Sequence, residues 1–98
     1  MNPASNGHPP LFPLGQVVST PGALAALQEA GQDPRELLSR HQAGDWGDMV
    51  DEDKAENDFS VNRELRIFSA YILSTGVKVW LITEADRSVS TFLLPSEY

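Results

Sequence analysis

The sequence predicts an α+β domain in which three helices are followed by a three-stranded antiparallel β-meander. Two segments each begin with a capping residue and a proline and end at a glycine, which is the pattern of a short helix. From position 66 onwards the chain is rich in strand-forming residues, interrupted by two short turns. Helices first and strands second are typical of the α+β class.

Residues 1–10 are uncharged and rich in Pro, Asn and Gly, and we expect them to be a disordered leader. Residues 11–98 are expected to form a single α+β domain, since a chain of 98 residues can build one hydrophobic core. Residues 11–14 contain three apolar side chains, which should begin the packing. Residues 16–18 are compatible with a short extended segment.

The first predicted helix begins after Thr20, whose hydroxyl can cap it, and has Pro21 at its first position. It ends at Gly31, a residue suited to the left-handed C-cap. The second helix repeats this pattern, with Asp33 as its cap and Gly44 as its end. Two capped helices this close together indicate a helical hairpin.

A third helix is predicted from about position 50 to position 62, with Asp48 or Asp51 near its N-cap. We expect Ala55 and Phe59 to face inward on this helix, because residues four apart lie on the same side. Its first turn carries three acids, which the positive end of the helix dipole favours.

Three strands are predicted at residues 67–73, 77–83 and 88–94, with Gly76 in the first turn and Pro95 after the last strand. All three carry apolar residues on both faces, whereas a half-exposed sheet alternates apolar with polar. Either the helices and residues 11–14 cover both faces, or the second face is an interface. A homodimer through this face would satisfy the second alternative.

The charge of the chain is concentrated in one block. Ten acids and three bases lie between positions 28 and 62, and this block accounts for the whole formal charge of −7. Such a field repels nucleic acid and anionic membranes and attracts basic protein surfaces, so we expect a basic protein as partner, including a nucleic-acid-binding protein. The alternative is that the block is only a solvated surface. The candidate partner-binding carboxylates surround the start of the third helix: Asp45, Asp48, Asp51, Glu52, Asp53 and Glu56.

Trp46 stands between Gly44 and Gly47, and this setting admits two interpretations. The functional interpretation is an aromatic anchor for a partner. The structural interpretation is a loop Trp that folds back into the core between the second and third helices, with the glycines supplying the bends. We favour the structural anchor, because a Trp contributes a large buried area to a small core.

The sequence offers no support for catalysis or for a cofactor. It has no Cys, no G-x-S-x-G nucleophile motif and no Gly-rich phosphate loop. A calcium loop counted from Asp45 lacks ligands at its third and fifth positions, so we expect no metal. His41, near a helix end, is expected to be a partly buried structural residue rather than a base. We therefore expect no enzyme, no catalytic residues and no cofactor.

The absence of Cys, of a signal peptide and of an apolar run long enough to span a membrane favours a cytoplasmic protein.

The chain contains several unusual short motifs, each of them once: LFPLGQVV at 11–18, TPGAL at 20–24, GDWGD at 44–48, ITEADR at 82–87 and LLPSEY at 93–98. Through these motifs, residues 11–98 resemble a family of short bacterial proteins that are labelled plasmid-related, some of them as a type I restriction enzyme M subunit. The resemblance implies an origin on plasmids and other mobile elements, and it brings no established activity or catalytic residues. The Asn/Asp-Pro-Pro-Tyr/Phe loop of a methyltransferase is absent.

Composition and resemblance together predict a small, acidic, non-catalytic protein-interaction module of mobile-element origin. Inhibition of a host defence nuclease, of the restriction or CRISPR type, is a role that a nucleic-acid-like acidic surface would allow. The alternative is a structural or regulatory accessory protein that self-associates or docks through the apolar face of its sheet.

Overall fold

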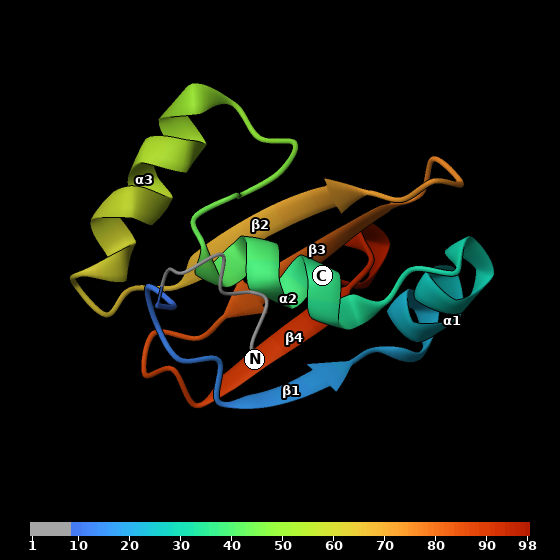
Figure 1. Ribbon diagram of the computed structural model, residues 1–98, viewed down its shortest axis with the longest axis horizontal. Coiled ribbons are helices and arrows are strands. Elements are labelled where there is room, and N and C mark those ends of the chain that lie inside the picture. Colours follow the sequence, from blue (N-terminus) through green and yellow to red (C-terminus); the bar gives the residue numbers. More distant parts are fainter. Residues whose placement is uncertain (1–8) are drawn as a thin grey trace.

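The computed structural model describes residues 9–98, in which α1 and α2 cover one face of a four-stranded sheet and α3 lies beside one edge (Figure 1). Residues 1–8, most of the predicted leader, lie outside the described residues. The strands stand in the spatial order β1-β4-β3-β2. In chain order the elements are β1 (Gln16–Ser19), α1 (Pro21–Ala30), α2 (Pro34–Gln42), α3 (Asp51–Val61), β2 (Ile67–Ile72), β3 (Lys78–Thr83), β4 (Val89–Leu93) and the 3-10 helix η2 (Pro95–Glu97).

The predicted arrangement of three helices followed by a three-stranded antiparallel meander is wrong. A fourth strand, β1, precedes the helices and pairs in parallel with β4, so the sheet is mixed. The backbone makes this pairing: the Gln16 amide donates to the Ser88 carbonyl at 2.9 Å, and the Thr20 amide donates to the Phe92 carbonyl at 3.0 Å. All four β1 side chains are exposed. The short extended segment expected at residues 16–18 is this strand. Without apolar alternation, its sequence did not indicate pairing with β4.

Within this mixed sheet, the antiparallel pairing of β2 with β3 and of β3 with β4 agrees with the prediction. The turn between β2 and β3 contains Gly76 at a φ of 89°, a conformation that favours glycine. The two hairpins need only short connections, which is why local turn signals were enough to predict them.

The predicted starts of α1 and α2 are confirmed. The Thr20 hydroxyl accepts a hydrogen bond from the Ala23 amide at 3.2 Å, and the Asp33 carboxylate accepts one from the Arg35 amide at 2.9 Å. Gly31 closes α1 in the left-handed conformation, with a φ of 63°. These contacts satisfy amides and carbonyls that helix ends leave without partners.

The main core lies between α1, α2 and the face of the sheet that they cover, here called the inner face. A second cluster, around Phe12, Trp46 and Ile67, extends this core toward α3. Phe12 is buried, so the prediction that residues 11–14 begin the packing is confirmed at that position. The main cluster consists of Ala23, Ala26, Leu27, Leu37, Tyr71, Leu73, Val79, Leu81 and Phe92.

The opposite, outer face of the sheet is only partly covered. Phe68 and Trp80 lie on it in contact, with ring centroids 4.7 Å apart, and Tyr98 packs edge-on against Trp80 at 5.6 Å. Both Phe68 and Trp80 are half-buried, and Ile72 is exposed. The helices and residues 11–14 therefore do not cover both faces of the sheet, and apolar side chains remain accessible on the outer one.

Candidate functional site

Helix α3 is attached to the edge of β2 by polar side chains. The Asn57 side chain donates from Nδ2 to the Phe68 carbonyl at 2.6 Å and accepts the Phe68 amide on Oδ1 at 3.1 Å. Asn57 and Ser60 are the buried residues of this helix. An edge strand presents unpaired peptide groups, and a carboxamide is able to satisfy a donor and an acceptor together. Hydrogen bonding therefore determines which side of α3 faces the sheet.

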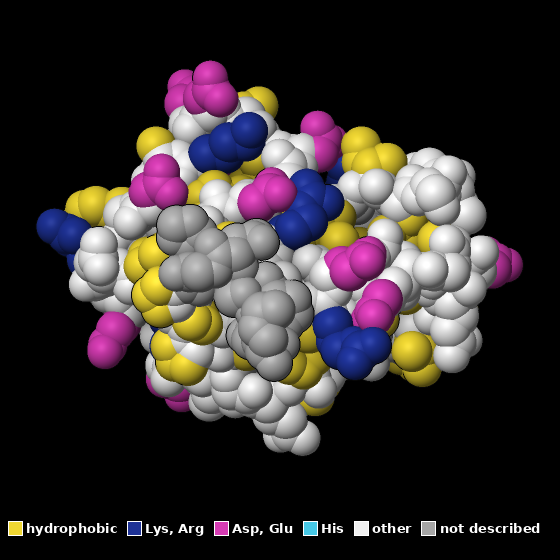
Figure 2. Space-filling view, viewed as in Figure 1, with side chains coloured by type: hydrophobic (Ala, Val, Ile, Leu, Met, Phe, Trp, Pro, Cys, Tyr) yellow, Lys and Arg dark blue, Asp and Glu magenta, His cyan; other side chains and the backbone are white. Residues whose placement is uncertain are grey.

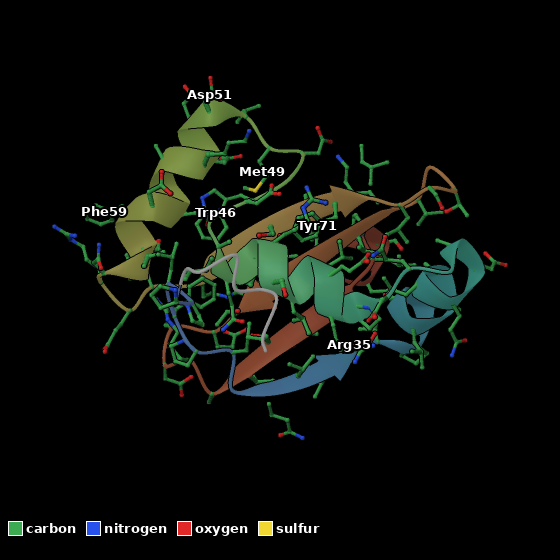
Figure 3. The ribbon with its side chains drawn as sticks, in the orientation of Figure 1. Arg35, Trp46, Met49, Asp51, Phe59 and Tyr71 are labelled. Carbon is green, nitrogen blue, oxygen red and sulfur yellow. The ribbon has the colours of Figure 1, made fainter. Side chains whose placement is uncertain are left out.

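The prediction that Ala55 and Phe59 face inward is wrong. Both are exposed, Phe59 at 52%, and Figure 3 shows Phe59 on the outer side of α3, pointing away from the sheet. Their spacing does place them on one side of the helix, as expected. The side of α3 that carries Asn57 bonds to the sheet edge, so the side that carries Ala55 and Phe59 faces solvent. The N-cap of α3 is Val50, without a side-chain hydrogen bond, and Asp51 next to it is the first residue of the helix, near the cap as expected.

The loop before α3 covers the β2 edge at Ala70. The Asp48 amide donates to the Ala70 carbonyl at 2.7 Å, and the Ala70 amide donates to the Trp46 carbonyl at 3.0 Å. Between them, Gly47 has a φ of 81°, and a Cβ at this position would lie 2.0 Å from the Ala70 carbonyl oxygen. Only glycine allows the loop to approach the strand this closely.

Trp46 is buried, with 3% of its surface exposed, as the structural interpretation predicts. Its Nε1 donates to the Asp58 carboxylate on α3 at 3.1 Å. Its ring stacks on Phe12 and meets His41 edge-on, with centroids 6.3 Å and 5.8 Å apart. Figure 3 places Trp46 between α2 and α3. The residue therefore joins α3 to the main body of the domain and is inaccessible to a partner.

A buried chain of hydrogen bonds runs from α2 across the inner face. The two ring nitrogens of His41 meet the hydroxyls of Ser69 at 2.5 Å and of Thr83 at 2.9 Å. The Thr83 hydroxyl lies 2.6 Å from that of Ser90, which donates to the Leu14 carbonyl at 2.8 Å. Because a carbonyl only accepts, Ser90 donates its proton to Leu14 and accepts from Thr83. Thr83 in turn accepts from Nε2 of His41, so Nε2 carries the proton and Nδ1 accepts from Ser69.

This setting keeps His41 neutral. Burial lowers its pKa from 6.5 to about 3, and the nearby positive charge of Arg87 adds to this effect. His41 is fully buried, more than the partial burial that we expected. Since no solvent reaches the ring, the structural role predicted for His41 fits its position.

The six candidate carboxylates fall into two groups. Asp45 pairs with Arg40 at 2.6 Å, and this hydrogen-bonded contact lowers the pKa of Asp45. Asp48 pairs with Lys78 at 3.1 Å, so these two acids are occupied within the chain. Figure 2 shows Asp and Glu side chains over α3 with hydrophobic atoms between them. The other four are exposed on α3 and form no ion pair within residues 9–98: Asp51, Glu52, Asp53 and Glu56.

Two shallow hollows flank α3, and the sequence did not reveal either. The first encloses about 340 Å³ between the outer side of α3 and the segment that follows it. Its lining consists of Glu52, Ala55, Glu56, Phe59, Ser60 and Leu65. The second encloses about 290 Å³ between α3 and β2, and it is lined by Met49, Asp53, Glu56, Asn57, Ser60, Arg66 and Phe68. The sequence did contain a signal for the first hollow. Acidic and apolar residues share one side of the predicted third helix: Glu52, Ala55, Glu56 and Phe59.

Within the part of the chain that the structure describes, no three His, Asp or Glu side chains come together in a way that could hold a metal ion. No helix among the described residues has the length and apolar character needed to cross a membrane. Comparisons with protein-family models, with curated proteins and with solved structures give no match for this chain.

Proposed function

We propose that this chain is a small, non-catalytic protein-interaction module that binds a basic protein surface through the outer side of α3. The observation that carries the proposal is the orientation of this helix, which buries Asn57 and Ser60 and exposes Phe59. Hydrogen bonds to the β2 edge account for this orientation, and its result is an aromatic side chain at the surface of the domain. An exposed aromatic side chain surrounded by polar residues is typical of a protein interface.

The charge of this surface defines the class of partner. Four carboxylates without ion pairs in residues 9–98 lie on α3 of a chain whose net charge is −7. Their field favours approach of a basic surface and opposes approach of nucleic acid. We propose a nucleic-acid-binding protein as the partner. A restriction or CRISPR nuclease is the specific candidate, because the resemblance to plasmid-related proteins implies a mobile element that would benefit from inhibiting it.

A second candidate function is docking or self-association through the outer face of the sheet. The observation that favours it is the accessible apolar surface there, where Ile72 is 57% exposed and Trp80 is only half-buried. Light scattering on wild type and on Ile72→Ser tests this candidate. A dimer that the substitution dissociates would support it, and a monomer at all concentrations would count against self-association.

The main proposal is tested by capture from extracts of the native host. The bait proteins are wild type, a variant with Asp51, Glu52, Asp53 and Glu56 changed to Asn or Gln, and the control Glu29→Gln. Glu29 lies exposed on α1 and forms no ion pair within residues 9–98. We expect wild type and control to retain a basic nucleic-acid-binding protein that the quadruple variant loses. Equal retention by all three baits would contradict the proposal.

A further inference from the structure

Building on the proposed function, we propose that the hollow lined by Phe59 and Leu65 receives one aliphatic side chain of the partner, flanked by Lys or Arg side chains that lie on Glu52 and Glu56. The occupant is therefore a short segment of a basic protein. The proposed function specifies only a basic surface on the partner, and this inference adds an aliphatic residue within it.

The floor of this hollow is apolar. Phe59 and Leu65 are 52% and 46% exposed, and Ala55 lies between Phe59 and the helix start on the same side. Covering such surface with an aliphatic side chain is favourable, because it removes apolar area of both molecules from water. A smaller apolar cavity of about 150 Å³ accommodates benzene, so about 340 Å³ is ample for one leucine or isoleucine side chain.

The rim of the hollow is negatively charged on one side. Glu52 and Glu56 stand one helical turn apart and both line the hollow. Beyond the lining residues, after the C-terminal end of α3, the Arg63 guanidinium lies 4.0 Å from the centroid of the Phe59 ring. The partner should therefore place its basic residues toward the N-terminal half of α3, and its aliphatic residue beside Phe59.

The second hollow offers a place for one of these basic side chains. Glu56 and Ser60 line both hollows, so the two adjoin. In the second, the Asp53 and Glu56 carboxylates lie beside the apolar side chains of Met49 and Phe68. This combination suits a lysine, whose hydrocarbon stem packs on apolar surface while its ammonium group reaches the carboxylates.

Arg66 also lines the second hollow, but its positive charge is already engaged. Its Nε lies 3.3 Å from the Glu84 carboxylate, and it donates to the Tyr98 hydroxyl at 3.0 Å. The two free acidic side chains therefore dominate the charge that an incoming lysine meets.

The test uses two short synthetic peptides that differ at one position. Both are lysine-rich; one has a central leucine and the other a central serine. Titration into isotope-labelled protein is followed by the NMR amide signals. We expect the leucine peptide to bind at least about fivefold more tightly, as for an interface anchor, and to shift the signals of Ala55, Phe59 and Leu65.

Matched variants locate the effect. Phe59→Ser and Leu65→Ser should remove the difference between the peptides, whereas Leu24→Ser, at an equally exposed apolar position on α1, should preserve it. Thermal unfolding of each variant checks that the fold is intact. Equal binding of the two peptides, or a leucine effect that maps to other residues, would overturn the inference while leaving a purely electrostatic partner site in place. Failure of both peptides to bind would also overturn it, and the capture experiment would then decide the proposed function independently.

Discussion

Helices α2 and α3 are of similar length, nine and eleven residues, but they bury different kinds of side chain against the sheet. Helix α2 buries Leu37 and His41, whereas α3 buries Asn57 and Ser60 and exposes Phe59. The difference follows from what each helix covers. Helix α2 lies on the sheet face, where Leu37 joins the apolar core and His41 bonds to strand hydroxyls. Helix α3 lies at the sheet edge, where the peptide groups of β2 need hydrogen-bond partners. The side of α3 that carries Ala55 and Phe59 is consequently exposed.

Replacing Trp46 by Ala should produce the largest effect, because this side chain joins the two regions. We expect a loss of about 3–5 kcal/mol in the free energy of unfolding, as for other large-to-small changes in a core. Denaturant unfolding monitored by circular dichroism measures it. A variant as stable as wild type would show that Trp46 does not hold α3 to the domain.

The buried side of α2 should make the protein sensitive to acid through His41. Unfolded His41 binds a proton near pH 6.5, whereas in the folded protein its pKa is about 3. Between these values the unfolded state binds more protons, so stability falls as the pH falls, by up to about 1.4 kcal/mol per pH unit. At about pH 4.5 the total loss should reach about 2–3 kcal/mol.

His41→Gln provides the comparison for this pH effect, since Gln retains a donor and an acceptor but does not titrate. Urea unfolding of both proteins from neutral pH down to about pH 4.5 isolates the contribution of His41, because all other titratable groups are common to the two proteins. We expect a shallower pH dependence in the variant. Parallel curves for the two proteins would contradict a buried, neutral His41.

On the sheet-facing side of α3, Asn57→Ala should cost about 1–3 kcal/mol, because the amide and carbonyl of Phe68 both lose their partner. The exposed Asn62 at the end of the same helix is the control, and Asn62→Ala should change stability by less than about 0.5 kcal/mol. Equal effects at the two positions would mean that hydrogen bonds to β2 do not hold α3 in place.

On the outer side of α3, Phe59→Ala should change the free energy of unfolding by no more than about 0.5–1 kcal/mol, since the ring is half-exposed and the Arg63 guanidinium lies over it. A buried Phe would cost about 3–5 kcal/mol instead. Thermal or urea unfolding distinguishes the two cases, and a loss in the larger range would place Phe59 in the core.

The parts of the fold that depend on neighbouring residues could be predicted. The caps at Thr20 and Asp33 and the turn at Gly76 are local, so the bounds of α1, α2 and the hairpins followed from them. Strand β1 could not be predicted in the same way, because its pairing with β4 is made by the backbone across most of the chain. The orientation of α3 was missed for another reason: it depends on hydrogen bonds from the Asn57 side chain to the backbone of β2, which the apolar periodicity of the helix does not reveal.

For the candidate site, the acidic residues could be predicted from the sequence, but their ion pairs and the apolar hollow could not. The acidic character of α3 is evident in the composition, and so is the position of Asp51, Glu52 and Asp53 in its first turn. The pairing of Asp48 with Lys78 depends on the tertiary fold, so the sequence could not show that this acid is already occupied. The apolar hollow was missed because the helix was expected to turn Phe59 inward.

The central claim, that the outer side of α3 binds a basic partner, is tested most directly by the association rate at increasing salt concentration. The partner is the protein retained in the capture experiment, and the proteins compared are wild type and the variant neutralised at Asp51, Glu52, Asp53 and Glu56. Exposed charges are screened within about 8 Å at physiological ionic strength. We therefore predict a wild-type rate that falls steeply with salt, and a slower, nearly constant rate for the variant. Equal and salt-independent rates in both proteins would contradict the claim and would leave the acidic side chains of α3 as solvated surface.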